Sequence, residues 1–269
     1  MTGMTTDVSP AMIDSLAAAA RDAGRHLLAA PRPAPATTMA EFRQAFSAID
    51  DDVSAALGER LAAILPGVPA VDDLRGEIPE AGEAWVVDAI DGAVQYMHGL
   101  PQWCVSVALV RDGRPVAAVL HSPVPGETYA AGERLGATLN GGPLRPAATT
   151  ELAIALVATS HPPFAAAQPA ATQAAGAALT AVMSRVGAVR NLGPTSWQVA
   201  DVAGGRLDAF WMVGRDPGNL LAAALIAREA GLPVTDVAGR EWTARSDSFL
   251  AACPALREPL RELLAASRR

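Results

Sequence analysis

The sequence predicts an α/β protein whose N-terminal half is of the α+β kind. Three observations support this class: apolar stripes with helical spacing begin the chain, short apolar strands joined by tight turns follow, and strands alternate with helices in the second half. A run of strands beside helices indicates α+β architecture, whereas strand–helix alternation indicates an α/β layer.

Two helices are predicted first. The ranges 14–30 and 49–65 each repeat apolar residues at the spacing of a helix face. The proline-rich segment 31–38 ends the first helix, and Pro66-Gly67 ends the second.

Short apolar strands come next. Asp112-Gly113 between two apolar runs is a hairpin signal, and Asn140-Gly141-Gly142 marks a later turn. This half is therefore expected to contain an antiparallel meander. The strands are predicted over 84–87, 104–110, 115–121, 127–131 and 136–139.

The second half alternates strands with helices, which predicts an α/β layer. The strands are expected over 153–159, 186–191 and 207–212, and the helices over 165–182, 194–203 and 219–230. We therefore place a domain boundary near 145–150, which gives an N-terminal half, 1–145, and a C-terminal half, 146–269.

Composition limits the function classes. Hydrophobic residues make up 51% of the chain, which is enough for a substantial core and excludes a disordered chain. Apolar runs stay short of the ~18–20 residues of a membrane span. The net charge is −7, and all 21 basic residues are arginine without a basic stripe, which argues against nucleic-acid binding.

The cysteines and the N-terminal residues suggest a cellular compartment. Cys104 and Cys253 fit no metal-binding spacing, so we expect both to be reduced and buried. The N-terminal residues lack the basic-then-apolar pattern of a secretory signal. A cytoplasmic location is the expectation.

Two carboxylates follow the predicted strand that starts at Ala84. Asp88 comes at its end, and Asp91 follows on a tight turn with Gly92. Carboxylates three residues apart could bind the same hard cation, such as Mg²⁺, or two adjacent ones, and a glycine lets backbone N–H groups approach an anion. The alternative is that both aspartates only cap a turn.

The segment from Trp85 to Ala93, WVVDAIDGA, resembles the signature of the inositol monophosphatase family, in outline W-x-x-D-P-I-D-G-T. The segments 136–144, 191–211 and 220–231 resemble further family patterns in the same order, so the resemblance covers most of 14–265. It implies an α/β/α/β/α layered sandwich, usually assembled as a homodimer.

The resemblance also implies roles for individual residues. Asp88 matches the aspartate that bridges two metals, Asp91 matches a ligand of the second metal, and Ile90 matches a backbone carbonyl ligand. Asp72 stands where the family has a glutamate ligand. Asp50 matches the helix aspartate that orients the attacking water.

Four positions depart from the family pattern. Ala93 replaces a threonine whose hydroxyl pairs with the carboxylate at position 50, and a methyl group cannot do this. Asn219 replaces the third carboxylate of the second metal, although asparagine is also a good helix N-cap. Ala89 replaces a proline, and Met212 replaces an acidic residue that contacts substrate.

A helix is expected to begin within Gly193-Pro194-Thr195-Ser196. Its N-terminus could receive an anion or a sugar hydroxyl, or could simply be capped. The expected catalytic residues are Asp50, Asp72 and Asp88. The expected metal ligands are Asp72, Asp88, Ile90, Asp91 and Asn219. The expected substrate-binding residues are Asp91, Gly92, Ala93, Gly193, Thr195 and Asp216, the last near a position that faces substrate in the family.

The resemblance implies a Mg²⁺-dependent phosphomonoesterase, with Mn²⁺ as a possible replacement, acting on a small polyol, sugar or nucleotide phosphate. The departures imply weakened or altered activity. The alternative is a phosphatase-like protein without hydrolysis, either a binding module or an enzyme repurposed in a specialised biosynthetic pathway. The 1–145 half would carry the metal-binding carboxylates and the 146–269 half the substrate-facing loops. The expected partners are a small phosphorylated metabolite and a second copy of the chain, with no nucleic acid and no membrane.

Overall fold

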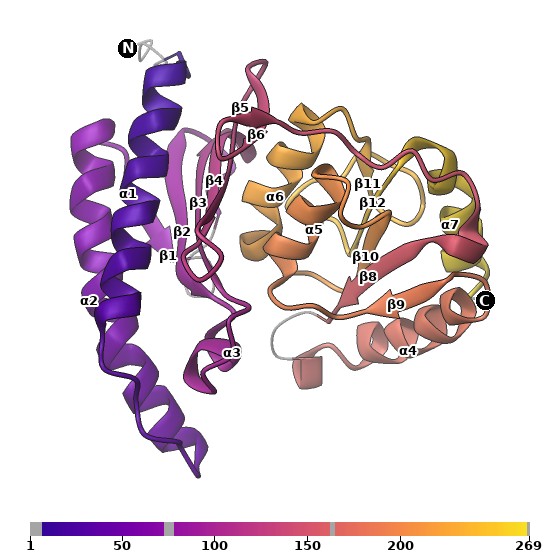
Figure 1. The fold of residues 1–269 in the computed structure, drawn as a ribbon, viewed down its shortest axis with the longest axis horizontal. Helices are drawn as coiled ribbons and strands as arrows, with labels where there is room; N and C mark the ends of the chain where they lie inside the picture. Colours follow the sequence, from indigo (N-terminus) through magenta and orange to yellow (C-terminus); the bar gives the residue numbers. More distant parts are fainter. Residues whose placement is uncertain (1–6, 73–77, 162–164, 268–269) are drawn as a thin grey trace.

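A computed structural model describes residues 7–72, 78–161 and 165–267. Its helices and sheets form successive layers, shown from one side to the other in Figure 1: α1 with α2, a seven-stranded sheet, α5 with α6, a five-stranded sheet, and α4 with α7. This arrangement confirms the predicted α/β/α/β/α sandwich.

Helices α1 (Pro10–Ala29) and α2 (Met39–Ile64) cover the outer face of the larger sheet. The predicted start of α2 at residue 49 is wrong, because the helix begins ten residues earlier. The Thr38 hydroxyl accepts the Glu41 N–H at 3.2 Å, and the Glu41 carboxylate accepts the Thr37 N–H at 2.8 Å. These reciprocal bonds satisfy one backbone donor in the first turn and one just before the N-cap, so the helix starts there.

The larger sheet has the strand order β1-β2-β3-β4-β5-β6-β7. Strand β1 is parallel to β2, and every later pair is antiparallel, which confirms the predicted meander. The strands are β1 (Ala70–Asp72), β2 (Glu83–Asp91), β3 (Cys104–Arg111), β4 (Arg114–Ser122), β5 (Glu127–Gly132), β6 (Gly136–Leu139) and β7 (Gly142–Pro143).

The smaller sheet has the order β11-β12-β10-β8-β9, with β8 parallel to both β9 and β10 and β12 antiparallel to β10. Its strands are β8 (Leu156–Ser160), β9 (Ala188–Arg190), β10 (Ala209–Val213), β11 (Val234–Thr235) and β12 (Ser248–Ala252). The remaining helices are α3 (Ala93–Met97), α4 (Pro169–Met183), α5 (Thr195–Ala203), α6 (Pro217–Glu229) and α7 (Pro254–Ala266), with 3₁₀ turns at Leu152–Ile154 and Ala165–Ala167.

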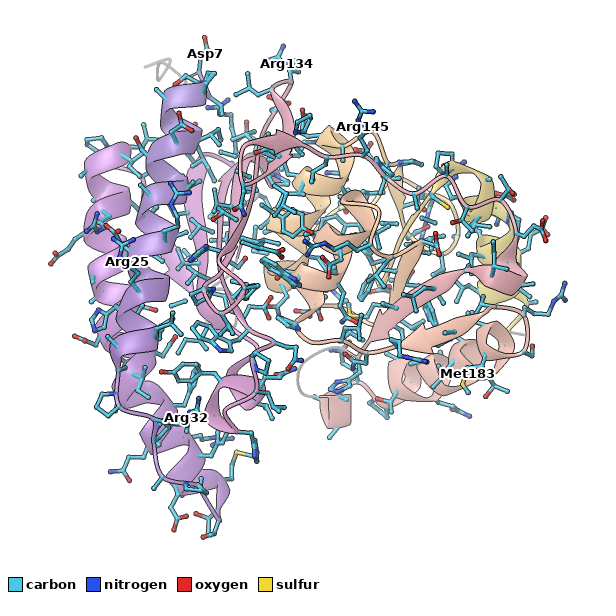
Figure 2. All side chains as sticks on the ribbon, viewed as in Figure 1. Asp7, Arg25, Arg32, Arg134, Arg145 and Met183 are labelled. Atoms are coloured by element: carbon cyan, nitrogen blue, oxygen red, sulfur yellow. The ribbon has the colours of Figure 1, made fainter. Side chains whose placement is uncertain are left out.

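Apolar side chains fill the spaces between the layers (Figure 2). The central cluster joins Val86 and Ala118 of the larger sheet to Val199 and Leu221 of α5 and α6, so both halves of the chain contribute to it. Both cysteines are free and buried, as predicted. Within the described ranges, none of the helices has the length and apolar character needed to cross a membrane.

Candidate active site

An irregularity in the pairing of β2 with β3 determines where the two aspartates point. Asp88 pairs with Ser106, and Asp91 pairs with Cys104. Between these two pairs β2 contains one residue more than β3. Residues three apart on a regular strand face opposite sides of a sheet, but this bulge reverses the alternation. Because directly paired residues share a face, Asp88 and Asp91 both lie on the face of Cys104, toward α5 and α6.

Asp91 is almost fully buried, with 5% of its surface exposed. The hydroxyl of Ser196, on the first turn of α5, donates a hydrogen bond to its Oδ2. The Cys104 thiol lies 3.9 Å from the same oxygen and 3.5 Å from the Ser196 hydroxyl. Burial raises the pKa of Asp91 to about 7, the Ser196 hydrogen bond opposes this, and the negative charge of Asp216 adds to it.

Asp88 is half-buried, and its Oδ1 accepts the Ile90 N–H at 2.9 Å. This bond folds the carboxylate over the bulge and turns Ile90 into the core on the side of α1 and α2. The charge of Asp88 contributes to raising the pKa of the Cys104 thiol, after burial and the nearer charge of Asp91. The two carboxylates therefore surround one thiol on the same face of the sheet.

The first turn of α6 adds a second pair of polar side chains. The Asn219 Nδ2 donates to Asp216 Oδ1 at 2.9 Å. Asp216 is 5% exposed, and burial raises its pKa to about 6, against the effect of the Asn219 hydrogen bonds. Helix α6 packs against β2, and the charge of Asp216 acts on Asp91.

Two glycines let the site loops pack tightly. Gly92 has φ 94° at the N-cap of α3, and a Cβ there would lie 2.9 Å from the Gln102 carbonyl oxygen. Gly193 has φ 141°, and its Cβ would lie 2.7 Å from Gln102 Cβ. Both positions exclude a side chain, so the loops before α3 and α5 meet on the two sides of Gln102. Ala93 follows Gly92 as the first residue of α3 and is half-buried.

The N-terminal end of α5 is fixed by side chains. Gln198 accepts the Leu192 N–H at 2.9 Å and donates to the Gly193 carbonyl at 3.0 Å. The Thr195 hydroxyl donates to Ser160 at 3.1 Å. Thr195 is thus held against the end of β8, next to Ser196 and its bond to Asp91.

The other two predicted catalytic carboxylates come from β1 and α2. The backbone of Asp72 pairs with Val87 in parallel register, so Asp72 lies beside Asp88 at the carboxyl ends of the two strands. The side chain of Asp72 falls outside the described part of the structure. Asp50 is 6% exposed on α2, which packs against β2. Its role in orienting water remains a prediction.

The oxygen donors present fit a hard divalent cation. Within the described ranges no three histidine, cysteine, aspartate or glutamate side chains lie close enough together to hold a metal ion. However, Mg²⁺ commonly takes only one or two carboxylates and fills its other positions with water and substrate phosphate. Asp88 and Asp91 supply such carboxylates on one face. Asn219 Oδ1 is buried and accepts no hydrogen bond from the described residues, as expected of an oxygen suited to a cation.

A cavity of about 930 Å³ lies beside the same turn of α6 but is a different surface. Arg215 and Pro217, the neighbours of Asp216, line it together with Arg114, Arg228 and Arg245. Its arginines are partly neutralised by acidic partners on its rim. None of the predicted site residues is among the lining residues described, so the carboxylate chemistry lies outside this cavity.

The sequence model of the inositol monophosphatase family matches residues 12–269, and the chain therefore belongs to this family. It is similar to an inositol-1-monophosphatase of Mesorhizobium japonicum, with 33% identity over 176 residues, a match that spans 65% of each chain. It is also similar to the Nus factor SuhB of Pseudomonas aeruginosa, with 31% identity over 227 residues, or 84% of this chain and 78% of that protein.

Solved structures agree with this assignment. The extragenic suppressor protein suhB of Bartonella henselae superposes with a TM-score of 0.80 and 27% identity, over 95% of this chain and 99% of the other. The inositol monophosphatase of Anabaena gives 0.81 with 24% identity, over 95% and 96%. The predicted family and fold are confirmed. Phosphatases of this family generally depend on Mg²⁺. Membership of the family therefore supports hydrolase chemistry and a metal requirement for this chain.

The structure thus brings several predicted residues together and adds one that the sequence did not indicate. Asp88 and Asp91 share one face at the end of β2, Asp216 and Asn219 pair at the start of α6, and the charge of Asp216 acts on Asp91. Ser196 was visible only as part of a helix start. Its contact with Asp91 spans 105 residues, and no local pattern in the sequence could show it.

Proposed function

We propose that this protein is a Mg²⁺-dependent phosphomonoesterase, with Mn²⁺ as a possible replacement, which acts on a small polyol, sugar or nucleotide phosphate. The observation that carries the proposal is the β2 bulge, which points Asp88 and Asp91 toward α5 and α6 together. A bound divalent cation would supply charge stabilisation and an activated water. Asp72, Asp88, Asp91, the Ile90 carbonyl and Asn219 are the proposed ligands.

The chain's own residues prepare this site before any ligand arrives. Ser196 fixes one oxygen of Asp91, and the Ile90 N–H fixes one oxygen of Asp88, so both carboxylates keep their orientation. Preorganised groups of this kind cost little reorganisation during reaction. We place the substrate beside Gly92, Gly193 and Thr195, where the loops before α3 and α5 meet Gln102 and α5 begins.

Ala93 sets the level of activity in this proposal. It begins α3 directly after Gly92, beside the carboxylate site, and has no hydroxyl. In this proposal Asp50 orients the attacking water, and position 93 supplies no hydroxyl to help it. A positioned hydrogen-bonding group contributes about 10²-fold or more in rate, so we expect turnover well below that of an enzyme with threonine there.

The test is phosphate release from a panel of phosphomonoesters with and without Mg²⁺. We expect metal-dependent release that Asp88→Asn reduces at least about 100-fold. Asp52→Asn is the matched control, because Asp52 is an exposed carboxylate on α2 that pairs with His26 at 3.2 Å. Release that is independent of metal, or equal in Asp88→Asn and wild type, contradicts the proposal.

The second candidate is a phosphatase-like protein without hydrolysis, whether a binding module or an enzyme repurposed in a specialised biosynthetic pathway. Ala93 and the neutral Asn219 favour it, and some similar proteins carry the name Nus factor. It predicts that the panel gives no phosphate while a phosphorylated metabolite still binds in calorimetry. The same panel therefore separates the two candidates.

Assembly and location form the rest of the proposal. We propose a homodimer from the family resemblance, which light scattering would refute by giving only the 27.6 kDa monomer mass. A cytoplasmic location rests on the two free cysteines. The absence of a nucleic-acid partner rests on the net charge of −7, and filter binding to RNA and DNA at low salt tests it.

A further inference from the structure

Two buried oxygen atoms at the start of α6, one on its N-cap residue and one on its first turn, have no hydrogen-bond donor among the described residues. They are Asp216 Oδ2 and Asn219 Oδ1. Only 5% of the surface of Asp216 is exposed, so solvent water does not reach this oxygen to donate a hydrogen bond to it. A buried carboxylate oxygen without a partner is costly and rare, unless a cation binds it.

The hydrogen bond between these residues fixes how the two oxygens are presented. Asn219 Nδ2 donates to Asp216 Oδ1 at 2.9 Å. The opposite amide orientation would place the Asn219 oxygen against a carboxylate oxygen, so the bond determines the flip state. This hydrogen bond uses Asp216 Oδ1. It leaves Asp216 Oδ2 and Asn219 Oδ1 as acceptors without a donor among the described residues.

The two buried carboxylates Asp216 and Asp91 repel each other. The charge of Asp216 acts on the buried Asp91 at the end of β2. His161 acts on Asp216 in the opposite sense and lowers the pKa of that carboxylate. The adjacent Arg215 directs its guanidinium to the Ala244 carbonyl at 3.5 Å. Two buried carboxylates that repel each other are stabilised by a cation bound between them.

We propose that Asp216 is a ligand of the divalent cation, and that it supplies the negative charge that Asn219 does not carry. Asp216 Oδ2, Asn219 Oδ1 and Asp91 would together hold the ion from α6 and β2. Together with Asp88, which the proposed function also makes a ligand, these residues supply carboxylate and amide oxygens, the donors that Mg²⁺ accepts alongside water and phosphate. The inference rests on the proposed metal-dependent function. It assigns Asp216 to the metal instead of to the substrate.

The pairing also explains why the charge lies at position 216 alone. If both positions were aspartate, the Nδ2 donor would be lost and two carboxylates would meet at hydrogen-bond distance. With Asn219, one residue carries the charge and the other donates to it. The charge lies three residues before Asn219, at the N-cap of α6, and the hydrogen bond keeps the two side chains together.

The experiment is calorimetric titration of the full chain with MnCl₂ at neutral pH. We expect Asp216→Asn to weaken binding at least about tenfold, because Asn keeps the shape and removes the charge. The exchange variant Asp216→Asn/Asn219→Asp returns a carboxylate to the same turn and should recover most of the affinity. Asp88→Asn shows the affinity that remains when the proposed site is disrupted. Asp52→Asn is the control and should bind Mn²⁺ like wild type.

The outcomes separate this inference from the proposed function. Wild type that binds no Mn²⁺ overturns the metal-dependent function, and this inference with it. Asp216→Asn binding as tightly as wild type, while Asp88→Asn does not bind, overturns only the role of Asp216. Thermal unfolding gives a second readout: added Mn²⁺ should raise the Tm of wild type more than that of Asp216→Asn. If Asp216→Asn does not fold, the test rests on the exchange variant Asp216→Asn/Asn219→Asp. A folded exchange variant that has lost its affinity for Mn²⁺ contradicts the inference.

Discussion

The contact between Ser196 and Asp91 gives a sharp prediction for Ser196→Ala. The Ser196 hydroxyl is fully buried and donates to Asp91 Oδ2, and the Cys104 thiol lies 3.5 Å from it. Removing it takes one charge-assisted hydrogen bond from a buried carboxylate. Such bonds contribute about 1.5–3 kcal/mol. If this free energy orients Asp91 for the metal, Mn²⁺ affinity falls by about 10- to 150-fold.

The assay is calorimetric titration with MnCl₂, with thermal unfolding as a check on folding. Ser122→Ala is the matched control, because Ser122 is also buried and donates to the Trp103 carbonyl at 2.8 Å instead of to the site. We expect Ser122→Ala to lose stability and keep its metal affinity. Equal metal affinities in Ser196→Ala and wild type would refute the argument that this hydroxyl prepares Asp91.

Three further predictions follow from the structure. Ala93→Thr should raise phosphate release by about 10²-fold, and no gain in a folded variant would contradict the role given to this position. Gly92→Ala should lower the free energy of unfolding in urea by about 1–3 kcal/mol, because φ is 94° and the added Cβ meets a carbonyl oxygen. Gly58→Ala, where the added Cβ meets nothing within 4 Å, should raise it by about 0.5–1 kcal/mol. A stable Gly92→Ala would show that the loop relaxes. Burial lowers the pKa of His121, so its contribution to stability is present above about pH 6.5 and is lost as pH falls through the lowered pKa. His121→Gln should therefore unfold with a weaker dependence on pH between 8 and 5, and parallel curves for both proteins would refute this.

Much of the fold could be predicted because its signals are local. The meander follows from short apolar runs and the Asp112-Gly113 turn, which the structure shows as the link between β3 and β4. The start of α2 was also present in the sequence, as Thr38 three residues before Glu41, but the proline-rich segment before it concealed this signal. Strand β12 and helix α7 have no counterpart among the predicted elements. Every residue of β12 is buried, so that strand shows no alternation.

The site was predicted in part. Asp88 and Asp91 could be singled out by type and spacing, but the bulge that places them on one face arises from pairing with β3. Asn219 was recognised as a departure, whereas its hydrogen bond to Asp216 depends on side-chain geometry at the start of α6. Ser196 depends on the packing of α5 against β2. Contacts between elements distant in sequence leave no local pattern, which is why these parts required the structure.

The central claim is that the β2 bulge makes Asp88 and Asp91 act on the same cation. The most direct test is a double-mutant cycle of Mn²⁺ affinity with Asp88→Asn, Asp91→Asn and the double variant. We predict that each single variant loses affinity and that the double variant loses clearly less than the two losses combined, because either change already disrupts the shared site. Additive losses, or one single variant with wild-type affinity, would contradict the claim.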